Sequence, residues 1–227
     1  MSHKPFDLLP KSMQNSEVAR YLQLLDSKKG TLFFKRLFDV VLSALLLVIT
    51  SPVLLLCALA VKLDSPGPVF YRQQRVGRYN QIFRIFKFRS MVVNADKLGP
   101  HITVGRDPRI TRVGRFLRIT RLDEFVQLIN VIIGDMSMVG PRPEVRRYVD
   151  VYSDERLATL LIRPGITGSA SIEFKDENAM LEGVEQPEKV YINEILPVKM
   201  DINLRYLRDL SLWEDLKILC NTVLCIF

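Results

Sequence analysis

The strongest pattern along the chain is a long apolar run near its N-terminal end. Val40 to Val61 carries no charged residue, and as a straight helix it would be roughly 33 Å long. That length is enough to cross a bilayer core of about 30 Å, so the simplest prediction is one transmembrane helix. Pro52 removes a helix hydrogen bond near the middle of the run, and the Ser51 hydroxyl could bond the backbone group that is freed.

Cations flank the apolar run at both ends. Lys28, Lys29, Lys35 and Arg36 precede it, and Lys62, Arg72, Arg75 and Arg78 follow it. A helix that crosses once should show this bias on one side only. A helix-break-helix that enters and returns on the same face would explain both the break and the charges, with each half roughly 15 to 18 Å long. From these residues alone, the spanning helix and the re-entrant hairpin both stay open.

Shorter periodic segments lie on either side of the run. Val18 to Leu25 predicts an amphipathic helix that could rest on a membrane surface. After the turn cluster at 64–68, Val69 to Val76 and Ile82 to Phe88 predict a β-hairpin. Alternation in the second strand places Lys87 and Arg89 on one face, with Phe86 and Phe88 on the other.

The rest of the chain has mostly helical spacing. Arg109 to Ile133 predicts helix, with Thr120 and Asp123 as a capping pair. Asp154 to Leu161 predicts a second helical stretch, between rigid Pro-Gly loops at 140–143 and 163–168. Asn203 to Phe227 is amphipathic and could pack in the core or lie at a membrane interface. The predicted fold is α+β and mostly helical, divided into an extension (1–34), an anchor (35–62) and a catalytic domain (63–227).

Composition narrows the possible chemistry. The chain has 32 Lys and Arg against 25 Asp and Glu, and between Lys62 and Arg121 only Asp64, Asp96 and Asp107 oppose the cations. Such a block favours anionic partners: nucleic acid, acidic lipid or phosphorylated substrates. With His3 and His101 as the only histidines, histidine-based zinc sites and triads are disfavoured. The cysteines show neither metal spacing nor a disulfide framework, which favours a reducing compartment.

The best candidate for chemistry is the cluster Arg118, Arg121, Asp123 and Glu124. Adjacent carboxylates point about 100° apart on a helix, so one could attack a substrate while the other holds a cation. Oxygen ligands without histidine favour Mg²⁺ over zinc. Arg118 could hold a phosphate. The alternative is that Asp123 caps a helix and Glu124 is a surface charge.

Two further arginines lie in rigid loops. Arg142 sits between two prolines that preset its direction, and Arg163 precedes Pro164-Gly165. Both suit a positioned phosphate ligand, and both equally suit an arginine that pairs with a nearby acid.

Taken in order along the chain, these pieces resemble the bacterial sugar transferase family, the monotopic polyprenyl-phosphate phosphoglycosyl transferases. The matching segments are Lys35-Arg36-Leu37-Phe38-Asp39, Ser51-Pro52, Phe86 to Met91, Arg118 with Leu122-Asp123-Glu124, Gly134 to Ser137, Val139 to Pro143, Arg163 to Gly168, and Leu212 to Lys217. Their number and order make the resemblance specific.

The resemblance implies a monotopic fold with interfacial helices and a re-entrant anchor broken at Ser51-Pro52. It implies an active site on the cytoplasmic face of a bacterial inner membrane. Nucleic-acid binding by the basic residues is disfavoured because the sequence shows no recognisable module for it and carries a membrane anchor. The implied reaction moves a sugar 1-phosphate from a UDP-sugar to polyprenyl phosphate. By the same mapping Asp123 is the nucleophile, Glu124 binds Mg²⁺, and Lys87, Arg118 and Arg142 contact phosphates, with Arg89 and Arg163 as further candidates.

One segment departs from the family pattern. Ser169 to Glu177 replaces a motif in which many members carry Trp and a later Arg, so contacts to nucleotide or sugar differ there. The sequence names neither the sugar, the glycan pathway nor the oligomeric state. The competing hypothesis is a non-catalytic membrane adaptor that binds acidic lipid or a partner through its basic residues.

Overall fold

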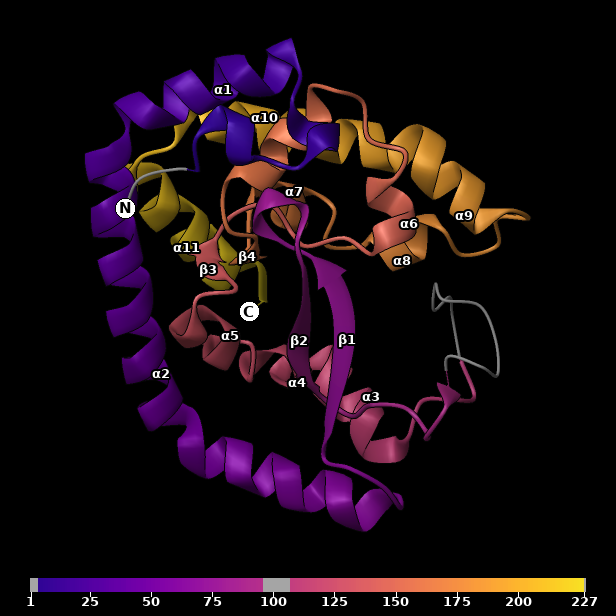
Figure 1. The fold of residues 1–227 in the computed structure, drawn as a ribbon. Helices are drawn as coiled ribbons and strands as arrows, with labels where there is room; N and C mark the ends of the chain where they lie inside the picture. Colours follow the sequence, from indigo (N-terminus) through magenta and orange to yellow (C-terminus); the bar gives the residue numbers. More distant parts are fainter. Residues whose placement is uncertain (1–3, 96–106, 227) are drawn as a thin grey trace.

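The computed structural model describes residues 4–95 and 107–226, in which helices surround a central β-hairpin (Figure 1). His3, Asp96, His101 and Phe227 lie outside the described residues. The helices and strands are α1 (Ser16–Ser27), α2 (Lys29–Asp64), β1 (Phe70–Val76), β2 (Ile82–Phe88), α3 (Arg112–Ile119), α4 (Leu122–Phe125), α5 (Leu128–Ile133), β3 (Ser137–Val139), α6 (Arg146–Val149), β4 (Gly165–Thr167), α7 (Ser169–Glu173), α8 (Glu177–Met180), α9 (Pro187–Val190), α10 (Leu196–Asp209) and α11 (Leu212–Ile226). Short 3₁₀ turns are η1 (Phe6–Leu8), η2 (Lys11–Met13), η3 (Arg78–Asn80) and η5 (Arg156–Leu161), and η6 (Tyr191–Ile195) is a π-helical turn. The prediction of a mostly helical α+β fold is confirmed.

Helix α2 carries the predicted break. It runs down one side of the molecule and then turns sharply (Figure 1), and Pro52 lies inside it. Pro52 has no N–H to donate to the carbonyl of Val48, four residues earlier. The Ser51 hydroxyl donates to that carbonyl instead, at 2.8 Å. The predicted compensation by Ser51 is confirmed, and a proline is the usual cause of so sharp a kink.

Both halves of α2 pack against the rest of the protein. In the first half, the Ser43 hydroxyl lies 3.1 Å from the sulfur of Met138 in β3. In the second half, Leu54, Cys57 and Val61 pack with Phe88 of β2 and Leu117 of α3. The outer surface is apolar and more than half exposed at Phe33, Phe34, Leu37, Val41, Leu45, Val48, Ile49, Leu55, Leu56 and Leu59. Within the described residues, α2 is the one helix long and apolar enough to cross a membrane. The re-entrant path itself stays a prediction.

A buried polar network fastens the first half of α2 to the domain. The Lys35 ammonium lies 2.6 Å from a carboxylate oxygen of Asp215 in α11, and the Tyr206 hydroxyl donates to the other oxygen at 2.6 Å. Asp39, one turn after Lys35, accepts from the Ser137 hydroxyl at 2.7 Å and from the Met138 amide at 3.1 Å. Lys35, Asp39 and Asp215 are all buried. Buried charges are tolerated when they are paired and hydrogen-bonded in this way.

The N-terminal amphipathic helix uses its apolar face inside the protein. The predicted helix is present as α1, and Asn15 caps it by accepting from the Val18 amide at 2.8 Å. Val18, Tyr21, Leu22 and Leu25 are buried in the main core, which also contains residues of η5 and α10. That face is therefore not available to rest on a membrane, contrary to our expectation. The division into three segments stays a prediction.

The β-hairpin agrees with the sequence pattern. β1 and β2 pair antiparallel, with Tyr71 opposite Lys87 and Arg75 opposite Phe83. Tyr79 and Asn80 turn the chain with positive φ angles of 57° and 61°. β1 begins at Phe70, one residue after the predicted Val69, and β2 has the predicted bounds. Phe88 lies on the face opposite Lys87, as the alternation predicted, and there it is buried against α2.

The predicted helix from Arg109 to Ile133 is in fact three helices. Arg121 adopts a left-handed conformation, with φ of 58°, between α3 and α4. Thr120 does not form the predicted capping pair with Asp123, because its hydroxyl donates backwards to the carbonyls of Phe116 and Leu117 at the end of α3. Helical spacing persists across such a kink, so periodicity alone does not reveal it.

The two predicted Pro-Gly loops support each other. Gly140 donates to the Thr167 carbonyl and Gly165 donates to the Pro141 carbonyl, both at 2.9 Å, next to the short parallel pair of β3 and β4. A Cβ on Gly165 would lie 2.2 Å from the Gly140 nitrogen, so only glycine permits this approach. The second loop thus acts as a rigid backing for the loop that carries Arg142.

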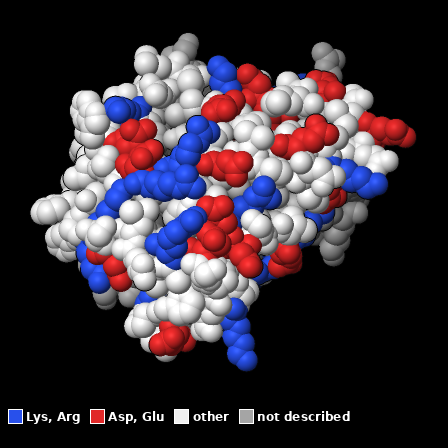
Figure 2. Space-filling model, turned by 90° about the horizontal axis from the view of Figure 1, so that it is seen from above, with Lys and Arg blue, Asp and Glu red and all other residues white. Residues whose placement is uncertain are grey.

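The predicted C-terminal amphipathic helix is divided at Leu210 and Ser211 into α10 and α11. α10 is largely buried, whereas α11 buries Asp215 and Ile218 and exposes Trp213, Val223 and Leu224. On the face that bears α1, basic and acidic side chains lie side by side rather than in a region of one sign (Figure 2).

Candidate active site

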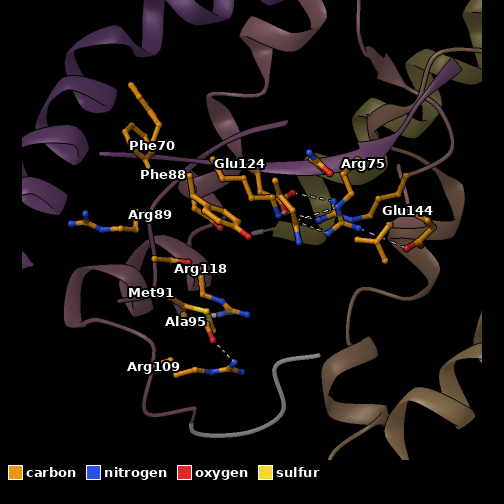
Figure 3. A pocket seen from close by; sticks show the side chains of 18 of the residues that line it. Phe70, Arg75, Phe88, Arg89, Met91, Ala95, Arg109, Arg118, Glu124 and Glu144 are labelled. Carbon is orange, nitrogen blue, oxygen red and sulfur yellow. Dashed lines mark hydrogen bonds and ion pairs between the residues drawn. The ribbon is translucent and has the colours of Figure 1, made fainter. Parts of the chain in front are cut away.

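A cleft of about 1010 Å³ runs beside the hairpin and collects most of the predicted site residues. β2 supplies Lys87, α3 supplies Arg118, α4 supplies Asp123 and Glu124, and the proline loop supplies Arg142. Figure 3 shows this group from close by, with Glu124 near the centre. Residues far apart in the sequence therefore meet at one place.

Glu124 is the electrostatic centre of the cleft. Its Oε1 accepts from the Lys87 ammonium at 2.7 Å, and Arg142 approaches both carboxylate oxygens, at 2.5 and 3.0 Å. Burial acts to raise the pKa of Glu124, but Arg142 and Lys87 outweigh it and hold the pKa well below its usual value. The same contact raises the pKa of Arg142. Glu124 is thus an ionised, fixed group and not the alternative surface charge.

Asp123 differs sharply from its neighbour. It is only 7% exposed, it lines the cleft, and no hydrogen bond to its carboxylate is found among the described residues. Burial, followed by the charge of Glu124, raises the pKa of Asp123, while Lys87, Arg118 and Arg121 act in the opposite sense. A carboxylate that is desolvated and lacks a partner is more basic, and hence a better nucleophile, than one held in an ion pair.

The backbone kink at Arg121 presents these two carboxylates. A positive φ is uncommon for a residue with a side chain, and such strain is often found at functional sites. The kink starts a new helical turn at Leu122, so Asp123 and Glu124 lie in the first turn of α4. Neither acts as a side-chain cap there, which removes the alternative interpretation of Asp123 as a capping residue.

Arg118 and Arg89 have different surroundings. Arg118 lines the cleft, and its charge lowers the pKa of Asp123. Arg89, expected beside Lys87, also lines the cleft, but its side chain points away from Glu124 toward α2 (Figure 3). Its guanidinium donates to the carbonyls of Val61 and Ser65, at 3.2 and 2.7 Å, and to the Ser65 hydroxyl at 2.9 Å. Because Arg89 follows the last residue of β2, the alternation of the strand no longer sets its direction.

Arg163 is not part of this cleft. Its Nε donates to the Gly134 carbonyl at 2.7 Å, behind the proline loop, and it lines a separate cavity of about 30 Å³ with Arg36 and Arg78. Burial, together with these two arginines, lowers the pKa of Arg163 to about 10. The structure therefore places Arg163 in a supporting position and does not bring it to the carboxylate pair.

Several residues at one end of the cleft were missed. Arg75 lies on the same face of the hairpin as Lys87, which the strand pairing could have revealed. Glu144 follows Arg142 by two residues, and Lys199 is a charged residue on the buried face of α10. Glu177 belongs to the segment that departs from the family pattern, and it reaches the cleft at the start of α8.

The donor set suits a metal that is held mainly by substrate. Glu124 accepts three bonds, so about one of the four acceptor directions of a carboxylate stays open, on Oε2. Mg²⁺ in nucleotide enzymes binds one or two protein carboxylates together with phosphates and water. No cluster of three or more metal-ligating side chains is found in the described part of the chain. Glu124, with Asp123 beside it, fits such a sparse site.

The cleft thus combines two adjacent carboxylates with Lys87, Arg118 and Arg142, and it lies in a protein whose longest helix has an exposed apolar surface. The sequence model of the bacterial sugar transferase family matches residues 30–227, and the chain belongs to this family.

Named relatives agree with this assignment. The UDP-glucose:undecaprenyl-phosphate glucose-1-phosphate transferase of Caulobacter vibrioides is 42% identical over 83% of this chain and 68% of its own length. The undecaprenyl-phosphate galactose phosphotransferase of Salmonella typhimurium is 36% identical over 86% of this chain and 41% of its own length. The exopolysaccharide production protein PSS of Rhizobium leguminosarum is 36% identical over 85% of this chain and 94% of its own length. The chain thus spans less than half of some curated relatives and nearly all of others.

Proposed function

We propose that the protein is a phosphoglycosyl transferase that moves a sugar 1-phosphate from a UDP-sugar to polyprenyl phosphate and so initiates synthesis of a lipid-linked glycan. The observation that carries this proposal is the contrast between Asp123, which is unpaired among the described residues, and Glu124, which is held by two cations. The names of the relatives support the two substrate classes.

The proposed reaction has two displacements at one phosphorus atom. An oxygen of Asp123 attacks the phosphorus next to the sugar, the bond from this phosphorus to the bridging oxygen breaks, and UMP leaves with the electron pair. The product on the protein is an aspartyl phosphosugar. An oxygen of polyprenyl phosphate then attacks the same phosphorus, and the Asp123 carboxylate leaves, which restores the enzyme and yields the lipid diphosphosugar.

The surrounding cations make this attack feasible. An anionic nucleophile approaching an anionic diphosphate is repelled unless positive charge offsets both. Lys87 and Arg142 hold Glu124 in place, and Arg118 lines the cleft beside Asp123. Mg²⁺ held by Glu124 and the diphosphate would supply additional positive charge when bound. Buried positions of these groups strengthen each electrostatic interaction relative to water.

The anchor is proposed to enter one leaflet and return, so that the active site stays on the cytoplasmic face of a bacterial inner membrane. Two observations support this: α2 bends at its proline, and both of its halves pack on the same domain. Its exposed apolar surface would contact phospholipid. Cysteine labelling before Lys35 and after Lys62 should place both positions on one face, and labels on opposite faces would contradict the re-entrant path.

The activity is tested with purified protein, polyprenyl phosphate, Mg²⁺ and a panel of UDP-sugars, by measuring UMP release. UMP should appear with at least one sugar and should be lost in Asp123→Ala and on addition of EDTA. Absence of UMP with every sugar, combined with binding to acidic liposomes that survives loss of Asp123 and Glu124, would favour the adaptor hypothesis instead.

A further inference from the structure

The chemistry of the cleft changes along its length. Next to the end of α2 the lining includes the apolar side chains Phe70, Phe88, Met91, Val93 and Ala95, interleaved with Arg89 and Arg109 but without a carboxylate among them. At the opposite end the lining consists of charged and hydroxyl-bearing groups, namely Glu144, Tyr148, Glu177, Tyr191 and Lys199, which we call the polar end. Figure 3 shows Glu124 between Phe88 on one side and Glu144 on the other.

Lys199 organises the polar end. Its ammonium lies 2.7 Å from Oε2 of Glu177, 3.0 Å from the Tyr191 hydroxyl and 3.5 Å from Oε1 of Glu144. The Tyr191 hydroxyl in turn donates to Oε1 of Glu144 at 2.7 Å. The side chains of Lys199 and Glu144 are each 6% exposed, whereas that of Glu177 is 27% exposed. Glu177 is therefore the member of the network most open to a ligand.

A second observation at the same end is an unpaired hydroxyl. Tyr148 is 6% exposed and lines the cleft, yet its hydroxyl oxygen has no hydrogen-bond partner among the described residues. Buried hydroxyl groups nearly always have a partner, and leaving one unpaired costs stability. The hydroxyl oxygen is itself buried, so a ligand hydroxyl would supply the missing bond only if the side chains that cover this oxygen move on binding.

We propose that the polar end receives the sugar ring of the nucleotide sugar, and that Glu177 determines which sugar is accepted. The inference rests on the proposed function. Sugar hydroxyls both donate and accept, and the polar end offers carboxylate acceptors beside ammonium and phenol donors. A diphosphate would be repelled by Glu144 and Glu177. A nucleobase would need an open aromatic face, but the rings of Tyr148 and Tyr191 lie 4.8 Å apart and are 6% and 3% exposed.

The position of the polar end agrees with this assignment. Arg142, which binds Glu124, and Glu144 are separated by Pro143 in an extended stretch without helix or strand. Alternate residues of an extended chain lie on one face roughly 7 Å apart. The polar end thus begins about that far along the chain from Arg142, which contacts Glu124, and the sugar is bonded directly to the phosphate that Asp123 would attack.

The test compares Glu177→Gln with the matched control Glu182→Gln, whose side chain is exposed and does not line the cleft. For the full-length enzyme in nanodiscs, kcat/KM is measured by UMP release for UDP-glucose, UDP-galactose and their N-acetyl counterparts. Glu177→Gln should change the ratio between the best sugar and its C4 epimer by about tenfold or more, because a charged hydrogen bond to a hydroxyl is lost. Glu182→Gln should leave all four values unchanged.

Two results would overturn the proposal. The first is that Glu177→Gln lowers kcat/KM by the same factor for all four sugars. The second is that Glu177→Gln changes the inhibition by UMP but leaves the ratios of kcat/KM between sugars unchanged, which would place the nucleoside at the polar end. Tyr148→Phe provides a second test: its melting temperature should not fall, because it removes an unpaired hydroxyl, while kcat/KM for the best sugar should fall. An unchanged kcat/KM in Tyr148→Phe would contradict the role of that hydroxyl. Wild-type protein that releases no UMP with any sugar would instead refute the proposed function itself.

Discussion

Replacing Lys35 by methionine tests whether the buried network fastens the anchor to the domain. Methionine keeps the length of the side chain and removes its charge. The Lys35 and Asp215 side chains are 6% and 2% exposed and lie 2.6 Å apart. Breaking a buried pair typically costs about 3 to 5 kcal/mol. Asp215 keeps its bond from Tyr206, so we expect Lys35→Met to lower the free energy of unfolding by about 3 kcal/mol, at the lower end of that range.

The assay is urea unfolding in detergent, followed by the fluorescence of Trp213, the single tryptophan, which lies in α11 two residues before Asp215. Lys29→Met is the matched control in the same helix, because the Lys29–Asp26 pair is 51% and 43% exposed and should contribute less than about 1 kcal/mol. The reasoning would be refuted if Lys35→Met lowered the free energy of unfolding no more than Lys29→Met does.

The pH dependence gives an independent check of the same network. Burial raises the pKa of Asp215, and Lys35 opposes that shift. Without Lys35 the pKa of Asp215 should rise further, so the variant binds a proton at Asp215 more readily when folded than when unfolded. The difference in the free energy of unfolding between wild type and Lys35→Met should therefore be largest at neutral pH. It should shrink as the pH falls and Asp215 becomes protonated. A stability difference between wild type and Lys35→Met that grows as the pH falls would contradict this account.

Three further outcomes follow from the cleft. Asp123→Asn should raise the melting temperature at pH 7, because the raised pKa of Asp123 means that its ionised form is disfavoured in the folded protein. An unchanged or lower melting temperature in scanning fluorimetry would contradict this. Arg142→Lys should lower kcat by about 10²- to 10³-fold in the UMP assay, because lysine cannot contact both carboxylate oxygens of Glu124 as Arg142 does. Near-normal turnover would show that this two-point contact is not needed for catalysis. Arg118→Gln should move the acidic limb of the kcat/KM profile to higher pH, because Arg118 lowers the pKa of Asp123, and a shift to lower pH would be inconsistent with its place beside Asp123.

Local sequence patterns predicted much of the fold because they depend on near neighbours. The hairpin, the amphipathic α1 and the serine that compensates for Pro52 each follow from residues within a few positions of one another. The sequence could not show that the apolar face of α1 is covered by η5 and α10, since that contact joins residues more than 100 positions apart. It also did not reveal the left-handed Arg121, because a kink of one residue barely disturbs helical spacing.

The candidate site likewise combines features that the local sequence predicts with features that depend on contacts between distant residues. Adjacent Asp123 and Glu124 could be selected from the sequence, but their opposite pKa shifts depend on the folded structure. Lys87 and Arg142, from other elements, hold the pKa of Glu124 low, whereas burial and the charge of Glu124 raise the pKa of Asp123. Arg89 and Arg163 share the residue type and motif context of the phosphate-binding candidates, yet both bind backbone carbonyls instead of Glu124, Arg89 at the edge of the cleft and Arg163 outside it. Residue type alone does not distinguish an arginine that faces a cleft from one that supports the loops around it.

The most direct test of the proposed mechanism is intact-protein and peptide mass spectrometry after incubation with a UDP-sugar and Mg²⁺ in the absence of polyprenyl phosphate. The mechanism predicts a phosphosugar adduct on Asp123 that disappears when polyprenyl phosphate is added and never forms in Asp123→Asn. An adduct on another residue, or full turnover by Asp123→Asn, would contradict it.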